Sequence, residues 1–434
     1  MGSWLIRGAT VVTADEANLV LPKADLLIRE SEIVGLWPSD QTPAGITAER
    51  TLDADGMVLL PGLINTHTHA AMTLLRGYAD DMELRPWLQE RIWPLEMKLE
   101  AEDVYWGTML GIAEMIRGGV TCFNDMYHFF AAAARAVVDS GIRGVISGVL
   151  LGFLPNAEES LKRAVAFAEE WRGAGDGRLA TMLGPHAPYT VPNPLFEKVI
   201  AAAKEIGLGI HTHLSETAAE VQDSLRDHGV TPVRRMHDLG MFAVHPVLAA
   251  HCVHLTDEDI EILVANRVGV AHNPGSNMKL ASGVAPVPRL LAAGAMVGLG
   301  TDGPASNNNL DMIEEMRLAA LLHKVSTGDP TVVHAPQALA MATRGGAAAL
   351  GLGDMIGQIK VGLKADLALL DFHQPHLQPR HDVVSHLVYS ARAGDVRTVF
   401  INGEAVMLDG KLLTMDEDEV YGQVTARLAR LTQQ

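Results

Sequence analysis

Short apolar runs that alternate with longer helix-type segments fill the middle of this chain. Each run has four to eight residues, the length of a buried strand, and the segments between them carry apolar residues at helical spacing. The runs cover residues 57–64, 120–123, 144–150, 179–183, 207–210, 247–250, 268–271 and 296–300, and helix candidates cover 101–117, 157–171, 194–206, 216–227 and 257–265. Eight such units over about 300 residues predict a (β/α)8 TIM barrel, which we place at residues 57–360.

The two ends of the chain have a different pattern from the middle. Residues 4–13 and 24–36 form short β-rich runs separated by turn residues, and residues 364–371 and 396–403 have the same character. None of these runs has a helical period. We therefore predict that residues 1–56 and 361–434 pair into one small composite β-sandwich domain.

Composition and net charge limit the classes of binding partner and the cellular compartment that we expect for this protein. The 434 residues carry a formal net charge of −18, which argues against nucleic acid or an anionic membrane as a partner. No run of about 18 apolar residues occurs, the first ten residues do not resemble a signal peptide, and Cys122 and Cys252 lie in apolar runs. These features predict a cytoplasmic enzyme with reduced thiols, a small-molecule substrate and no membrane segment. We also expect a homo-oligomer.

Histidines and carboxylates end six of the eight strand-type runs, where a barrel gathers its catalytic groups. Residues i and i+2 of a strand face the same side, so His67 and His69 can reach one metal ion. With His213 and Asp302 they give three imidazoles and a carboxylate, which leaves a coordination position open for water. We predict one divalent ion, Zn2+ with Fe2+ as the alternative, because the fourth run ends in His186 where a second metal would need a bridging lysine.

A water bound to such a metal becomes a nucleophile near neutral pH, so proton carriers are needed. Glu216 follows His213 by three residues and suits a general acid/base, with a helix-capping carboxylate as the alternative. Asp302 can accept a proton, and His251 can hydrogen-bond the nucleophile. For His211 and His254 a structural role is favoured, because His211 lies one pleat deeper and His254 starts the next helical region.

Two other classes of site are excluded by missing residues. A cytidine-type deaminase needs a His-x-Glu motif followed by Pro-Cys-x-x-Cys, and the chain has no pair of cysteines at that spacing. No Gly-rich loop of the Gly-x-x-x-x-Gly-Lys-Ser/Thr type is present to bind a nucleoside triphosphate.

Several motifs in this sequence resemble those of the amidohydrolase superfamily and, within it, the 5'-methylthioadenosine/S-adenosylhomocysteine deaminase family. The resemblance covers essentially the whole chain. It is carried by PGLINTHTH at 61–69, MTLLRG at 72–77, GPHAPY at 184–189, HLSET at 213–217, AHCVHL at 250–255, HNPGSNMKL at 272–280, GTDG at 300–303 and GLKADL at 362–367.

The resemblance implies an aminohydrolase that acts on C–N bonds in cyclic amidines. Members remove the exocyclic amine of adenine in a nucleoside and release ammonia and the inosine analogue. It implies that Glu216 protonates a ring nitrogen, Asp302 moves the water proton and His251 steadies the nucleophile. By the same resemblance, Glu96 binds ribose hydroxyls and His186 hydrogen-bonds the purine, whereas Glu96 alone would be interpreted as a solvated helix-start carboxylate.

One departure from the family bears on the substrate. Members that favour S-adenosylhomocysteine hold its carboxylate with arginines near the third strand, but residues 144–155 here contain none. Arg143 precedes this strand at the end away from the mouth. The apolar lining suits a methylthio group, so we predict 5'-methylthioadenosine as the preferred substrate, with S-adenosylhomocysteine and adenosine as further substrates.

Three alternatives remain open. The same scaffold supports guanine deamination and s-triazine hydrolysis, while a non-catalytic amidohydrolase-like scaffold protein would be expected to have lost metal ligands. A binuclear, dihydroorotase-like site would need the lysine that is missing from the end of the fourth run.

Overall fold

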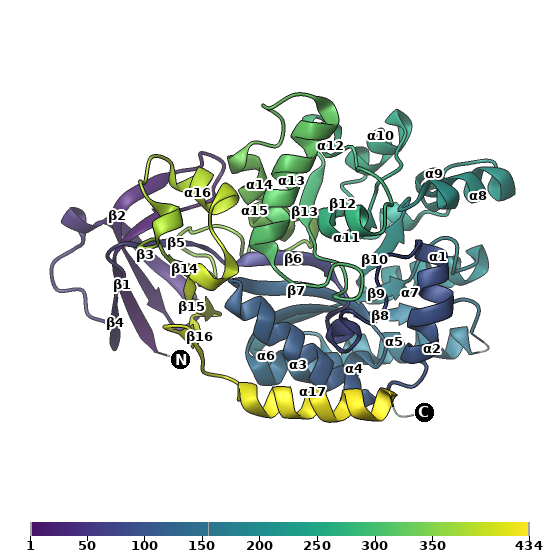
Figure 1. Cartoon of the computed structure of the whole chain (residues 1–434), viewed down its shortest axis with the longest axis horizontal. Coiled ribbons are helices and arrows are strands. Elements are labelled where there is room, and N and C mark those ends of the chain that lie inside the picture. The colour runs from purple at the N-terminus through teal and green to yellow at the C-terminus, as the bar shows by residue number, and fades with distance from the viewer. Residues whose placement is uncertain (1, 155, 433–434) are drawn as a thin grey trace.

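A computed structural model describes residues 2–154 and 156–432 and divides their strands between two sheets. The larger α/β part is a barrel of eight parallel strands, and the other sheet joins segments from both ends of the chain (Figure 1). The barrel strands are β6 (Leu63–Thr68), β7 (Val120–Tyr127), β8 (Arg143–Leu150), β9 (Leu179–Pro185), β10 (Gly209–Leu214), β11 (Val247–His251), β12 (Gly269–His272) and β13 (Met296–Leu299). The predicted barrel fold is confirmed.

Side-chain and backbone hydrogen bonds bring the last barrel strand to the first. The Thr66 hydroxyl donates to the Leu299 carbonyl at 2.8 Å, and the Asp302 amide donates to the His67 carbonyl at 3.0 Å. These contacts place the segment after β13 directly beside the metal-ligand candidates on β6.

Helices cover the outside of the barrel, and five of them lie at the residues where apolar spacing predicted a helix. Polar side chains cap the N-termini of several of these helices. The Thr217 hydroxyl accepts a hydrogen bond from the Glu220 backbone amide, and the Thr256 hydroxyl accepts one from the Asp259 backbone amide. The long barrel helices are α3 (Ala101–Arg117), α4 (Phe130–Ser140), α5 (Ala157–Trp171), α7 (Asn193–Ile206), α8 (Ala218–His228), α10 (Asp257–Ala265) and α13 (Met312–Thr327). No helix in the described ranges is long and apolar enough to span a membrane.

The first predicted strand, residues 57–64, proves to be two strands in different sheets. Residues Met57–Pro61 form β5, which pairs with β14 (Leu367–Asp371), whereas β6 begins at Leu63 and pairs with β7. Gly62 marks the crossing: a Cβ there would lie 2.0 Å from the Thr121 hydroxyl oxygen, so only glycine fits. The apolar run continues through the crossing because both strands are buried.

The sheet from the two termini has nine strands and two apolar faces. Residues Leu59, Leu367 and Leu369 lie on one face, within a separate core, and Val58 and Leu370 lie on the other face, which joins the barrel core. Its other strands are β1 (Ser3–Val12), β2 (Val20–Arg29), β3 (Glu32–Pro38), β4 (Arg50–Asp53), β15 (Val396–Ile401), β16 (Glu404–Leu408) and β17 (Lys411–Leu412). The domain limits at 57 and 361 stay a prediction, and the pairing of β5 favours Gly62 as the first crossing point.

A buried ion pair links the barrel to this second sheet. Arg143, the first residue of β8, donates from Nε and Nη2 to the Asp366 carboxylate at 2.7 and 3.0 Å. The Asn402 amide donates to the same carboxylate at 2.8 Å. Arg143 thus lies at the barrel end away from the catalytic mouth, as the sequence predicted.

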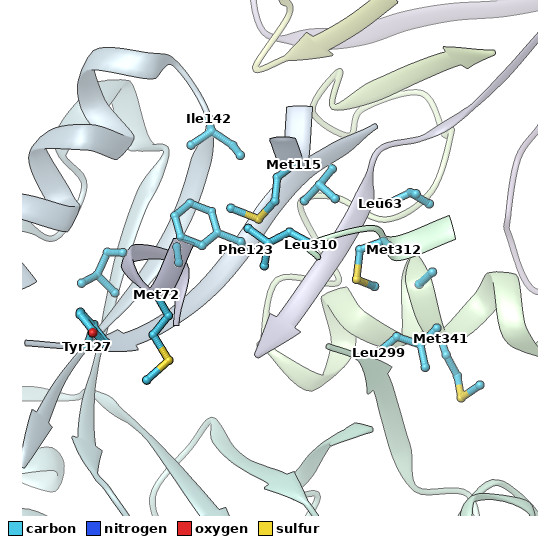
Figure 2. Packing of buried hydrophobic residues seen from close by; sticks show 14 of the residues in the cluster. Leu63, Met72, Met115, Phe123, Tyr127, Ile142, Leu299, Leu310, Met312 and Met341 are labelled. Atoms are coloured by element: carbon cyan, nitrogen blue, oxygen red, sulfur yellow. The ribbon is translucent and has the colours of Figure 1, made fainter. Parts of the chain in front are cut away.

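Large apolar side chains fill the space between the barrel strands and their helices. Figure 2 shows Leu63, Met115 and Phe123 in this packing, from β6, α3 and β7, together with Leu299 of β13 and Leu310. All five side chains are essentially buried. This core fixes the strand ends that carry the polar site.

Finally, α17 (Glu417–Thr432) lies along the barrel side beside α3 (Figure 1). Arg117 of α3 donates from Nε to the Glu417 carboxylate at 2.7 Å, which ties the last helix to the barrel.

Candidate active site and metal centre

All four predicted metal ligands lie together at the carboxyl ends of the barrel strands. The Asp302 Oδ1 lies 3.4 Å from His67 Nε2 and 3.2 Å from His69 Nε2, and His213 Nε2 lies 3.3 Å from His69 Nε2. His67, His213 and Asp302 are buried. The sequence prediction that these side chains converge on one point agrees with this geometry.

The arrangement of the imidazole nitrogens suits a bound cation. His69 Nδ1 donates to the Met126 carbonyl at 2.6 Å, and His213 Nδ1 donates to the His186 carbonyl at 2.7 Å. Each Nε2 therefore presents a lone pair to the centre. Within the described part of the chain, the buried His67 Nε2 has no hydrogen-bond partner. Converging lone pairs and an unsatisfied nitrogen fit a metal ion better than they fit an ion-free site.

His67 differs from His69 and His213 in the group that its Nδ1 contacts. Its Nδ1 lies 2.8 Å from His211 Nε2, and His211 Nδ1 lies 3.1 Å from the Ser147 hydroxyl. A His67 that turns the Nε2 lone pair to the centre carries its proton on Nδ1 and donates it to His211. Burial lowers the pKa of His67 to about 4, which favours the neutral, metal-binding form. His211 thus orients the ring of the metal-ligand candidate His67.

Asp302 is held by side chains that sequence reasoning did not identify. Its Oδ2 accepts hydrogen bonds from the hydroxyls of Ser276 at 2.6 Å and Ser306 at 2.8 Å, which leaves Oδ1 facing the histidines. Burial alone would raise the pKa of Asp302, but the neighbouring imidazoles of His67 and His69 hold it well below its usual range. Asp302 also has a left-handed backbone, with φ of 61°, so the fold constrains it strongly. Ser276 lies within the HNPGSNMKL motif, which is the sequence signal that could have identified it.

Glu216 lies in the same cavity as Asp302, and its pKa is shifted in the opposite direction. It is 4 % exposed, and burial raises the pKa of its carboxyl, so its protonated form is favoured. Its Oε2 lies 3.8 Å from His251 Nε2, and the Ser282 hydroxyl lies 3.5 Å from Oε1. The capping alternative does not describe Glu216, since Thr217 caps α8.

A second buried carboxylate, Glu220, holds the turn that carries Glu216. Its Oε1 accepts from the Ser215 amide at 3.0 Å and its Oε2 accepts from the Glu216 amide at 2.8 Å. Burial raises the pKa of Glu220 to about 7. This role could not be predicted from the sequence, because an acidic residue in the first turn of a helix is common.

His251 is also fixed by its backbone and by neighbouring amides. It has a positive φ of 73°, and its Nδ1 lies 2.8 Å from the Asn277 Oδ1. His251 therefore donates from Nδ1 and turns Nε2 toward Glu216. His254, for which a structural role was favoured, lies apart from the ligands, with Nε2 2.7 Å from the Ser282 carbonyl.

Glu96 and His186 line the same inner cavity, which measures about 70 Å³ and is bordered by Trp87 and Trp93. The Tyr127 hydroxyl donates to Glu96 Oε1 at 2.7 Å, which orients this half-buried carboxylate at the cavity wall. His186 Nδ1 lies 2.9 Å from the Thr190 hydroxyl, and burial lowers the His186 pKa to about 3. Every predicted site residue except His67 thus lines this one cavity, and His67 lies beside it with Nε2 3.4 Å from Asp302 Oδ1.

Comparison with known proteins places this fold and site in a family. Residues 58–406 match the model of the amidohydrolase family, and the chain belongs to that family. Within it the chain belongs with the 5-methylthioadenosine/S-adenosylhomocysteine deaminases. The protein of that name from Pelotomaculum thermopropionicum is 52 % identical over 431 residues, and that from Moorella thermoacetica is 51 % identical over 428, each alignment covering 99 % of both chains. The membership predicted from the sequence motifs is confirmed.

Solved structures agree with this placement. An adenosine deaminase from Xanthomonas campestris with bound zinc has a TM-score of 0.95 and 38 % identity, with 99 % of this chain and 98 % of that one covered. The atrazine chlorohydrolase TrzN from Arthrobacter aurescens complexed with zinc has a TM-score of 0.89 and 27 % identity, with coverage of 98 % and 100 %. Zinc is thus present in relatives that share this architecture.

Proposed function

We propose that this protein is a metal-dependent hydrolytic deaminase of adenine nucleosides, converting 5'-methylthioadenosine, S-adenosylhomocysteine or adenosine to the inosine analogue and ammonia. The observation that carries the proposal is the convergence of His67, His69, His213 and Asp302 on one point, with the buried Glu216 in the same cavity as Asp302. The opposite pKa directions of the two carboxyl groups, raised for Glu216 and lowered for Asp302, support Glu216 as the acid and Asp302 as the base. The names of the relatives and the zinc in the adenosine deaminase support the same assignment.

We propose one divalent ion in the site, Zn2+ with Fe2+ as the alternative, held by His67, His69, His213 and Asp302. Two sets of these and neighbouring side chains have ligand atoms within 4.8 Å of one another, which supports a single centre: His67 with His213 and His251, and His67 with His69 and Asp302. When bound, such an ion supplies a water nucleophile at neutral pH.

The protein's own groups then move the protons. Glu216 donates its proton to the ring nitrogen beside the attacked carbon, while Asp302 accepts a proton from water and passes it to the departing amine. The carbon–oxygen bond forms and the carbon–nitrogen bond breaks. The ionised Glu216 takes back the proton of the new hydroxyl as the carbonyl forms, so water and the adenine nucleoside give the inosine analogue and ammonia. His251 Nε2 steadies the attacking oxygen by a hydrogen bond.

Substrate recognition rests on two further residues of the cavity. Glu96, oriented by the Tyr127 hydroxyl, would accept hydrogen bonds from ribose hydroxyls, and His186 would hydrogen-bond the purine. Val149 and Leu151 add an apolar wall, which suits a methylthio group. A guanine or an s-triazine has no ribose for Glu96 to bind, and this favours a nucleoside.

The test is a panel assay on purified protein with metal analysis of the same sample. Ammonia release is measured from 5'-methylthioadenosine, S-adenosylhomocysteine, adenosine, guanine and a chlorotriazine. Turnover of the adenine nucleosides supports the proposal, whereas turnover of only guanine or the triazine contradicts it. Glu216→Gln should abolish turnover and keep the metal content near normal; loss of metal would make Glu216 a ligand instead.

Two further proposals concern the setting of the enzyme. A cytoplasmic location is supported by Cys122 and Cys252, which are both free and buried. A homo-oligomeric state remains a prediction, and size-exclusion chromatography with light scattering tests it.

A further inference from the structure

A second, much larger cleft adjoins the catalytic cavity. It measures about 950 Å³ and lies among α1 (Leu84–Pro86), the loop after β9, α8 and α9 (Pro232–Asp238). These helices lie toward the same side of the barrel in Figure 1. The cleft and the catalytic cavity share four lining residues, namely Leu84, Leu88, Trp93 and Tyr189. The two spaces are therefore neighbours across a common apolar wall.

The inner cavity alone is too small for a whole nucleoside. Its volume of about 70 Å³ compares with roughly 300 to 1,000 Å³ for sites that bury small ligands. The reacting end of the substrate must reach Glu216 and Asp302 in the inner cavity. The rest of the molecule then extends past the shared residues toward the outer cleft.

Arg235 of α9 lines this outer cleft and is only 7 % exposed. Its Nε donates to the Asn193 side-chain oxygen at 2.8 Å, and its Nη1 donates to the Pro188 carbonyl at 3.0 Å. Both partners are neutral. Over residues 2–154 and 156–432, no carboxylate oxygen lies within 4.0 Å of the Arg235 guanidinium.

Neighbouring arginines differ from Arg235 in this respect. Arg85, which also lines the cleft, forms an ion pair with Asp223. Arg234, the residue before Arg235, contacts Asp238 at 2.9 Å and Glu258 at 2.7 Å. A largely buried guanidinium without a counter-ion is costly, and a ligand carboxylate would complete its hydrogen bonding.

We propose that the outer cleft is the subsite for the amino-acid end of the nucleoside's 5' substituent and that Arg235 binds its carboxylate. This inference rests on the proposed deaminase function and assigns its substrate range. The positive charge that is missing from the third strand is thus provided by α9, and S-adenosylhomocysteine is accepted together with 5'-methylthioadenosine.

The experiment compares two substrates that differ in one group. We would measure kcat/KM for S-adenosylhomocysteine and for its decarboxylated analogue, in which hydrogen replaces the carboxylate, with 5'-methylthioadenosine as the reference. The unaltered enzyme should prefer the carboxylate by about 10- to 100-fold, the range for a hydrogen bond to a charged group. Arg235→Gln should abolish this preference, and Arg235→Lys should retain part of it because the charge remains.

Arg234→Gln is the matched control, since it removes the same charge from the adjacent position outside the cleft. It should leave the preference unchanged. A wild-type enzyme that does not distinguish the two substrates overturns the inference without any variant. So does an Arg235→Gln enzyme that loses activity equally on both, because Arg235 would then only hold the loop at Pro188. If no adenine nucleoside is deaminated, the proposed function itself fails; if 5'-methylthioadenosine is deaminated and the preference is absent, only this inference fails.

Discussion

The Nδ1 of His67 lies 2.8 Å from the Nε2 of His211, so one buried imidazole fixes the orientation of another. Backbone carbonyls do the same for His69 and His213 and cannot be removed by substitution, whereas His211 can be replaced. Groups that orient metal-binding histidines typically contribute 10- to 100-fold to metal affinity or activity.

His211→Gln should therefore weaken zinc binding by about 10- to 100-fold, because the orientation of the His67 ring is lost. Competition with a chromogenic chelator measures the affinity directly. The exposed His373→Gln is the control and should bind zinc like the unaltered protein. An unchanged affinity in the His211 variant would show that packing alone orients His67.

Glu220 provides a second test, because both of its oxygens accept backbone N–H donors from Ser215 and Glu216. In Glu220→Gln an NH2 group faces one of these amides, which leaves a buried donor unsatisfied at a cost of about 1 to 3 kcal/mol. We expect kcat to fall by about 10- to 100-fold through misplacement of Glu216, with little change in KM and with the metal retained.

Steady-state kinetics and metal analysis of the Glu220 variant check this expectation. The exposed Glu197→Gln is the control. If the Glu220 variant instead lost affinity for substrate and kept kcat, Glu220 would act in the outer cleft that it also lines and not through Glu216.

The sequence predicted the barrel and the central site residues because both depend on local patterns. Apolar runs of strand length marked the strands, and strand ends in a barrel must converge, which placed His67, His213 and Asp302 together. The apolar run 57–64 misled us about one boundary, since the crossing at Gly62 depends on the side chain of Thr121, nearly sixty residues later in the chain.

The supporting residues escaped prediction for a related reason. Ser306 and Glu220 are ordinary residue types at unremarkable positions, and their roles appear only when the fold sets them beside Asp302 and Glu216. Arg235 is a further case: the family motifs place positive charge near the third strand, whereas Arg235 lines the outer cleft from α9.

The pH dependence of kcat/KM should reflect the ionisation of the Glu216 carboxyl. If the protonated carboxyl is the acid, kcat/KM falls as the pH rises through its raised pKa. The Ser282 hydroxyl donates to Glu216 and favours the ionised form, so Ser282→Ala should raise this pKa further. We expect the alkaline limb of the kcat/KM profile to shift to higher pH by about half a unit, because the hydrogen bond that is lost is weak.

Rate profiles from pH 5 to 10 test this, with the exposed Ser326→Ala as control. A limb that moves to lower pH in the Ser282 variant would have the wrong sign and would assign the alkaline limb to another group.

The ion pair between Arg143 and Asp366 should be essential to the attachment of the second sheet. Both side chains are almost fully buried, and Asp366 also accepts from the Asn402 amide. Asp366→Leu leaves the guanidinium without its carboxylate, and removal of one partner from a buried pair costs about 3 to 5 kcal/mol of unfolding free energy. Arg143→Met with Asp366→Leu should lose less than Asp366→Leu alone, because no isolated charge remains. Urea unfolding of Arg143→Met, Asp366→Leu and the double variant measures these differences, and a double variant less stable than either single one would show that the pair itself contributes net stability.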